Sequence, residues 1–130
     1  MTSTVLDASA LLAFLNSEPG ADIVRTVLHD AIISAVNYTE VLKKTIERNG
    51  SADRVSGIIR DLSVAIIPFD APLAEATAAL YPETKPYGLS LADRACIALG
   101  LQRRATVFTT DAKWKLLKLS LKLKLIRNAH

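Results

Sequence analysis

Short apolar runs alternate along the chain with segments in which apolar residues recur at the spacing i, i+3, i+4, i+7. The short runs are typical of buried strands, and the longer spacing is typical of amphipathic helices. We expect strands at Thr4–Leu6, Ala31–Ser34, Val64–Phe69, Thr106–Thr109 and Leu119–Leu125. Because strands and helices alternate, the pattern predicts an α/β fold whose parallel sheet is covered on both faces.

The helices are predicted from apolar periodicity and from residues that favour helix starts. Asp70 is expected to cap a helix whose first turn contains Pro72. Pro82 to Gly88 is expected to form a loop. The predicted helices are Ala10–Asn16, Asp22–His29, Tyr38–Asn49, 52–62, 73–80, Ser90–Gln102 and the short segment Asp111–Leu116.

Four acidic residues occupy positions that core packing does not explain. Asp7 and Asp111 each end an apolar strand, whereas Glu40 and Asp93 lie near predicted helix starts. Ligands of parallel sheets bind outside the carboxyl ends of the strands, so these acids are expected to meet at one rim. Clustered carboxylates repel one another, and a divalent cation with oxygen ligands, Mg²⁺ or Mn²⁺, is the natural way to hold them together.

Each acid also has a local structural explanation. Asn37-x-x-Glu40 and Ser90-x-x-Asp93 are close to capping boxes, and the two acids at strand ends can cap the helices that follow them. Four separate caps are less economical than one shared site, which is the interpretation we favour. Both explanations stay open at the level of sequence.

The remaining reactive side chains are few. Ser9 and Thr109 stand two residues from an acid, where a hydroxyl can orient a carboxylate or serve only local structure. His29 and His130 offer no histidine pair for metal-free RNA cleavage. Cys96 shares a predicted helix face with apolar residues and is expected to be a buried structural thiol.

Length and composition predict one domain over residues 1–130, with 50% hydrophobic residues for a core. A single cysteine fits a reducing compartment. Met1 is not followed by the pattern of a signal peptide, and no apolar run approaches the roughly 20 residues of a membrane span. We therefore expect a cytoplasmic protein without membrane contact.

The net charge of +3 is unevenly distributed, because residues 112–130 contain only basic charges. Lys118, Lys122 and Lys124 could contact a phosphate backbone, or they could protect an edge strand from pairing with other sheets. Arg94, next to Asp93, is a further candidate phosphate contact, with surface solvation as its alternative.

Four motifs, taken together, resemble the PIN-domain family. They are Asp7-x-Ser9, Glu40 in the helix after the second strand, Gly88-Leu89-Ser90-x-x-Asp93-Arg94, and Thr109-x-Asp111 followed by Trp114. They occur in family order over essentially the whole chain. Within the family, the chain resembles the toxins of VapBC-type toxin–antitoxin pairs.

This resemblance implies a three-layer α/β/α fold with a mainly parallel five-stranded sheet and an endoribonuclease that depends on Mg²⁺ or Mn²⁺. Asn37 takes a position where the family often has a small polar residue, so it is a candidate indirect contributor to the site. The implied partners are RNA, with tRNA or ribosomal RNA favoured, a cognate antitoxin that blocks the acidic pocket, and a second copy in a homodimer. The family's acidic quartet maps onto Asp7, Glu40, Asp93 and Asp111, and its hydroxyl positions onto Ser9 and Thr109.

Other classes of protein fit less well. Scattered glycines offer no phosphate-binding loop of a P-loop or Rossmann protein. Position 9 is a serine where an aspartyl phosphatase wants a second acid, and Asp7 lacks the acidic neighbour of a phospho-acceptor receiver. A non-catalytic PIN-like module that binds RNA or protein stays open, and it predicts no stabilisation by metal.

Overall fold

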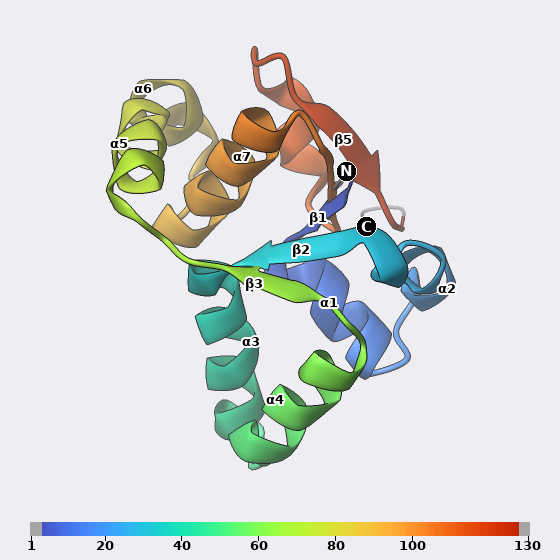
Figure 1. The fold of residues 1–130 in the computed structure, drawn as a ribbon. Coiled ribbons are helices and arrows are strands. Elements are labelled where there is room, and N and C mark those ends of the chain that lie inside the picture. The colour runs from blue at the N-terminus through green and yellow to red at the C-terminus, as the bar shows by residue number, and fades with distance from the viewer. Residues whose placement is uncertain (1–3, 128–130) are drawn as a thin grey trace.

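The computed structural model describes residues 4–127, so His130 and Met1 lie outside the described residues. Five parallel strands form one sheet in the order β3-β2-β1-β4-β5, which confirms the three-layer α/β/α fold class (Figure 1). The order places β1 at the centre, beside β2 and β4. The strands are β1 (Thr4–Leu6), β2 (Ala31–Ser34), β3 (Ala65–Ile67), β4 (Thr106–Thr109) and β5 (Lys122–Leu125).

Helices and short 3-10 segments connect the strands. The α-helices are α1 (Ala8–Leu15), α2 (Ala21–Arg25), α3 (Ala35–Glu47), α4 (Ala52–Asp61), α5 (Ala71–Ala79), α6 (Tyr81–Thr84) and α7 (Leu91–Arg103). The 3-10 segments are η1 (Leu28–Asp30), η2 (Lys85–Tyr87) and η3 (Ala112–Leu116). No helix within residues 4–127 is long and apolar enough to cross a membrane.

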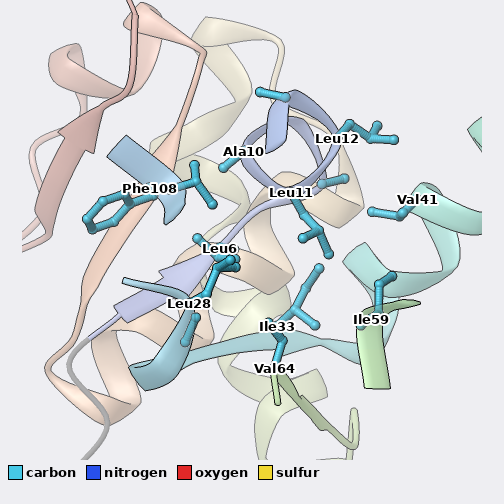
Figure 2. Packing of buried hydrophobic residues seen from close by; sticks show 14 of the residues in the cluster. Leu6, Ala10, Leu11, Leu12, Leu28, Ile33, Val41, Ile59, Val64 and Phe108 are labelled. Atoms are coloured by element: carbon cyan, nitrogen blue, oxygen red, sulfur yellow. The ribbon is translucent and has the colours of Figure 1, made fainter. Parts of the chain in front are cut away.

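One face of the sheet packs against α1, α3 and α4. Leu6 lies in register with Ile33 and with Phe108 on the neighbouring strands, and these side chains belong to one buried cluster. Leu11 from α1 and Val41 from α3 complete the cluster (Figure 2). Because alternate residues of a strand face opposite sides, this row fixes one layer of the fold.

The next residue of each strand faces the other layer. Val5 lies in register with Ile32 and Val107, and all three pack with α5 and α7. α7 approaches β4 so closely that a Cβ at Gly100 would collide with the Val107 side chain. The strands are therefore buried on both faces, as expected for a parallel sheet.

Two predicted boundaries are wrong in ways that affect the site. α3 begins at Ala35, directly after β2, because Ser34 both ends the strand and caps the helix through Val36 N (3.2 Å). Glu40 therefore lies in the second turn of α3, and the Asn37-x-x-Glu40 capping box does not form. The segment predicted as a loop after Pro82 is largely α6 and η2, since a proline is tolerated in the first turn of a helix.

Smaller differences concern element lengths. The predicted helix Asp22–His29 divides into α2 and η1, and the two outer strands are shorter than their apolar runs. The predicted start of α5 is confirmed, because Asp70 accepts a hydrogen bond from Leu73 N at 3.1 Å and Pro72 lies in the first turn.

Candidate metal-binding active site

Asp7 lies at the carboxyl end of the central strand and caps α1. Its Oδ1 accepts a hydrogen bond from Ala10 N at 2.8 Å, and its side chain is only 5% exposed. Its backbone N donates to Phe108 O, which continues the pairing with β4. Asp7 is thus fixed by both the sheet and the helix that follows it.

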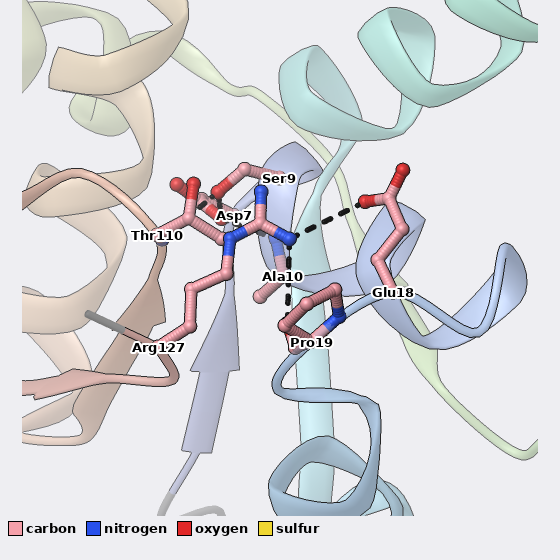
Figure 3. A network of polar contacts seen from close by, with 7 residues as sticks. All are labelled: Asp7, Ser9, Ala10, Glu18, Pro19, Thr110 and Arg127. Atoms are coloured by element: carbon pink, nitrogen blue, oxygen red, sulfur yellow. Dashed lines mark hydrogen bonds and ion pairs between the residues drawn. The ribbon is translucent and has the colours of Figure 1, made fainter. Parts of the chain in front are cut away.

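Two hydroxyl groups hold the Asp7 carboxylate from either side. Ser9 Oγ donates to Oδ1 at 2.7 Å and Thr109 Oγ1 donates to Oδ2 at 2.5 Å. Each hydroxyl also accepts a backbone N–H from the end of β4, Ser9 from Thr110 and Thr109 from Asp111, both at 3.1 Å. Figure 3 shows Ser9, Ala10 and Thr110 around Asp7. The hydroxyls therefore tie together segments about a hundred positions apart in the chain.

The environment of Asp7 disfavours its charge. Burial raises the pKa of the Asp7 carboxyl from 3.8 to about 6, although the hydrogen bonds from Thr109, Ser9 and Ala10 N act in the opposite direction. The nearby charge of Asp93 adds a smaller increase to the pKa of Asp7. A buried carboxylate beside a second carboxylate is a place where a cation would be stabilising.

Asp93 stands in the first turn of α7, where the predicted capping box is confirmed. Asp93 Oδ2 accepts from Ser90 N at 2.9 Å, and Asp93 N donates to Ser90 Oγ at 3.1 Å. The capping explanation and the site explanation are compatible, since the cap occupies one carboxylate oxygen and the other has no hydrogen bond within residues 4–127. The half-exposed side chain is held at the rim by its own helix.

Glu40 is held differently, because its side chain has no hydrogen bond or ion pair within residues 4–127. One turn earlier on α3, Asn37 is 1% exposed and its Nδ2 donates to Ala92 O at 3.1 Å. This bond joins α3 to the residue before Asp93. Asn37 Oδ1 has no partner within the described chain, which leaves a buried acceptor beside the acids.

Cys96 lies within electrostatic reach of three of the acids. Its thiol is fully buried, as predicted, and burial raises the pKa of Cys96, with further increases from the charges of Asp7, Asp93 and Glu40. The thiol therefore stays protonated at neutral pH and is a poor metal ligand. The oxygen atoms of the acids are the ligands left for a metal.

Asp111 lies beyond the end of β4 and caps η3. Its Oδ1 accepts from Lys113 N at 3.0 Å, and its own backbone N is held by Thr109. It therefore joins the rim through the same hydroxyl that bonds Asp7, while its second carboxylate oxygen has no hydrogen bond among the described residues.

The donor chemistry fits a hard divalent cation, because the candidate ligands are carboxylate oxygens. Within residues 4–127, however, no three acidic, histidine or cysteine side chains stand close enough to coordinate one ion. Carboxylates repel one another without a cation between them. An ion shared by these acids would therefore require them to stand closer together than they do here.

The basic residues occupy two separate places. Arg94 lies beside Asp93 at the rim, with Nη1 donating to Leu89 O at 2.9 Å. Lys124 lies in register with Phe108, and Lys122 with Thr106 at the opposite end of β4, so Lys122 is the more distant from the acids. Lys118, in the segment between η3 and β5, is exposed like the two strand lysines.

A second contact network locks the chain after β5 against the α1–α2 turn. Arg127 Nη1 lies 3.5 Å from Glu18 Oε1 and donates to Pro19 O at 3.3 Å (Figure 3). Gly20, with φ +99°, lets Ile126 approach, since a Cβ there would collide with it. Arg127 is thereby engaged in structure, whereas the side chains of Lys118, Lys122 and Lys124 have no hydrogen bond or ion pair within residues 4–127.

Comparison with known proteins identifies the family to which the chain belongs. The sequence profile of the PIN domain matches residues 4–118, and the chain therefore belongs to the PIN domain family. A search of curated proteins gives no match.

Several solved structures share the fold. A chain of a toxin–antitoxin complex from Klebsiella pneumoniae aligns with a TM-score of 0.76 at 18% identity, covering 98% of this chain and 100% of that chain. A chain of DNA-bound VapBC from Salmonella typhimurium also gives 0.76, at 16% identity with 98% and 100% coverage. FitAcB from Neisseria gonorrhoeae gives 0.65 at 26% identity, covering 83% of this chain and 87% of that chain.

Proposed function

We propose that this PIN-domain protein is a metal-dependent endoribonuclease that uses Mg²⁺ or Mn²⁺ and acts as the toxin of a toxin–antitoxin pair. The observation that supports the activity is the link from Asp7 through Thr109 to Asp111, together with the charges of Asp7, Asp93 and Glu40, which all raise the pKa of the same buried thiol, Cys96. Carboxylates with a divalent ion suffice for phosphodiester hydrolysis, and no histidine pair is needed.

The proposed roles follow from how each acid is held. Asp7, Asp93 and Asp111 bind one ion, and Glu40 completes a second site or binds through water. When bound, the ion activates water and stabilises the charge that develops on the phosphate. Ser9 and Thr109 orient Asp7, while Asn37 keeps α3 and α7 at a fixed separation through Ala92.

The proposed partners rest on the structural neighbours. The Klebsiella pneumoniae and Salmonella typhimurium structures are complexes of toxin and antitoxin, and they match nearly the whole of this chain. We infer that a small co-encoded antitoxin covers the acidic rim and that two copies of the chain form a homodimer. Inducing the chain alone should arrest growth, and co-expressing the antitoxin should restore it.

The proposed substrate is RNA, with tRNA or ribosomal RNA as targets, and basic residues are the means of capture. Arg94 is at the rim, whereas Lys118, Lys122 and Lys124 are exposed along the β5 side. A Lys122→Ala/Lys124→Ala double variant should bind RNA more weakly and with a smaller salt dependence. An unchanged salt dependence would assign these lysines to edge-strand protection.

Cleavage of total RNA tests the activity. Purified protein should produce discrete fragments with Mg²⁺ or Mn²⁺ and none with chelator. Asp7→Asn should lower the rate at least about a hundredfold, because loss of a ligand should exceed the 10- to 100-fold effect of losing a group that supports one. Asp70→Asn is the matched control, since Asp70 is also a helix cap but belongs to α5. Equal cleavage by the Asp7 variant would show that the site is wrongly assigned.

A non-catalytic PIN-like module is the second candidate, favoured by one observation. Asp7, Asp93 and Asp111 all serve as helix caps, so each has a structural role without any metal. This candidate predicts RNA or protein binding with no cleavage and no stabilisation by Mn²⁺. The cleavage assay and the melting temperature together distinguish the two functions.

A further inference from the structure

An exposed aromatic ring beside two cations lies next to the acidic rim. Tyr81, the first residue of α6, is 48% exposed. Arg94 Cζ lies 5.2 Å from the centroid of its ring, and Lys85 Nζ lies 5.9 Å from it. Neither cation forms an ion pair with a carboxylate within residues 4–127. We call these three residues the Tyr81 cluster.

The cluster is held in place before any ligand arrives. Arg94 Nη1 donates to Leu89 O at 2.9 Å, which fixes the guanidinium at the start of α7. The buried Thr84 hydroxyl donates to Leu80 O at 2.9 Å and lies 3.3 Å from Tyr81 O, which secures the single turn of α6. A preformed site loses less conformational entropy when it binds a ligand.

The cluster adjoins the proposed catalytic acids through one helical turn. Arg94 directly follows Asp93, and successive residues of an α-helix point about 100° apart. Asp93 is therefore available to the acidic rim while Arg94 is directed towards Tyr81. A polyanion whose phosphate lies at Asp93 would pass its neighbouring nucleotide over the cluster.

We propose that Tyr81, Lys85 and Arg94 form a subsite for an unpaired nucleotide of the RNA substrate, next to the scissile phosphate. This inference rests on the proposed function and names the side chains that would hold one nucleotide beside the cleaved bond. The Tyr81 ring and the guanidinium plane stack the base, and Lys85 neutralises a phosphate. Bases in a duplex are already stacked on their neighbours, so the subsite selects loops and unpaired ends.

The cluster could instead serve only to join α6 to α7. That role predicts that losing the ring lowers the melting temperature and leaves RNA affinity unchanged. The nucleotide subsite predicts that losing the exposed Tyr81 ring leaves the melting temperature unchanged and lowers the affinity for RNA. The two roles are therefore separated by measuring both quantities on the same variants.

The test measures binding of a fluorescein-labelled single-stranded oligoribonucleotide to the full chain, with chelator present so that cleavage plays no part. Tyr81→Leu should weaken binding about tenfold, and Tyr81→Phe should bind as the parent protein does. Affinity for a blunt duplex of the same sequence should stay within about twofold in all variants, as expected if stacking of an unpaired base is what is lost.

The charges have a matched control elsewhere in the molecule. Arg25 Cζ on α2 lies 5.9 Å from the ring centroid of Phe14 on α1, which makes a second arginine–aromatic pair. Arg94→Ala should weaken single-strand binding and reduce its salt dependence, and Arg25→Ala should change neither. Lys85→Glu gives a further test, because Lys85 is an exposed surface residue and its substitution should leave the fold intact.

Three results would overturn the subsite. They are no RNA binding by the parent protein, equal losses for duplex and single strand, and weaker binding of the antitoxin with unchanged RNA affinity. The last result would place the cluster in a protein interface. The proposed function fails separately: a parent protein that binds single-stranded RNA but never cleaves it retains the subsite and loses the nuclease.

Discussion

Asp7 and Glu40 represent two ways of holding an acid at one site. Asp7 is 5% exposed and accepts hydrogen bonds from Ser9, Ala10 N and Thr109. Glu40 is half-exposed, and its side chain has no hydrogen bond or ion pair within residues 4–127. The first carboxylate is oriented in advance at the expense of burying a charge, and the second is free to adjust. Under the proposed function, Asp7 would be an anchored metal ligand and Glu40 an adaptable one.

The largest expected effect concerns the burial of Asp7. Its folded-state pKa of about 6 exceeds the ordinary value of 3.8, so between these pH values the folded protein holds a proton that the unfolded chain lacks. Stability without metal should therefore fall as pH rises through this window, by about 3 kcal/mol. Asp7→Asn should remove this loss and be more stable than the parent protein at pH 7.5.

Denaturant unfolding with chelator, from pH 4 to 7.5, measures this effect as the difference between parent protein and variant. Asp70→Asn, at the exposed cap of α5, should follow the parent protein closely, because asparagine caps a helix as well as aspartate. Parallel curves of unfolding free energy against pH for the parent protein and Asp7→Asn would show that burying the Asp7 charge does not destabilise the fold. The contrast drawn between Asp7 and Glu40 would then lose its first member.

Metal binding gives the next largest effect. Mn²⁺ at about a hundred times its dissociation constant should stabilise the parent protein by about 2.7 kcal/mol through mass action. Asp7→Asn should abolish this gain, whereas Glu40→Gln should keep part of it because other oxygen ligands can adjust. Thermal melting with and without Mn²⁺ reports both variants. Equal losses in the two variants would contradict the distinction between anchored and adaptable ligands.

Thr109→Val tests the hydroxyls around Asp7. The substitution keeps the shape of the side chain but leaves Asp7 Oδ2 and the Asp111 N–H without their partner. We expect a loss of about 2 kcal/mol in the free energy of unfolding. Thr106→Val, at the start of the same strand, should change stability by less than about 0.5 kcal/mol, since its hydroxyl forms no hydrogen bond within residues 4–127. Similar values for both would show that the bridge is unimportant.

Asn37→Ala has the smallest expected effect and concerns the adaptable side of the site. It removes the bond to Ala92 O that fixes α3 against α7. The position of Glu40 on α3 is then no longer fixed relative to Asp93 on α7. We expect kcat to fall about tenfold with little change in KM. Thr39→Ala is the control, because its exposed hydroxyl bonds only to Ala35 O within α3. A change confined to the melting temperature would make Asn37 purely structural.

Local sequence predicted the elements that carry the acids rather well. The strands Thr4–Leu6, Ala31–Ser34 and Thr106–Thr109 have the predicted bounds, because each is a short apolar run at the centre of the sheet. The Ser90–Asp93 capping box also formed as predicted, since a cap depends only on residues three positions apart.

Predictions from local sequence were wrong where the start of a helix depends on the elements packed around it. Ser34 leads from strand to helix without a loop, and the three residues before Tyr38 are helical although two of them, Val36 and Asn37, are weak helix formers. Pro82 marks a helical turn here rather than a loop. Tyr81 received no role from the sequence, because its partner Arg94 is thirteen positions away on another helix.

The sequence by itself determined which chemistry is present: four acids at strand ends and in helices, two hydroxyls beside them, and no histidine pair. Only the tertiary structure decided that Thr109 bonds Asp7 across 102 positions and that Asn37 bonds Ala92 across 55. It also decided that Asp7 is buried and Glu40 is not. The physical reason is that caps and strands follow from neighbours in the chain, whereas burial and cross-strand bonds follow from the strand order β3-β2-β1-β4-β5, which no local periodicity specifies.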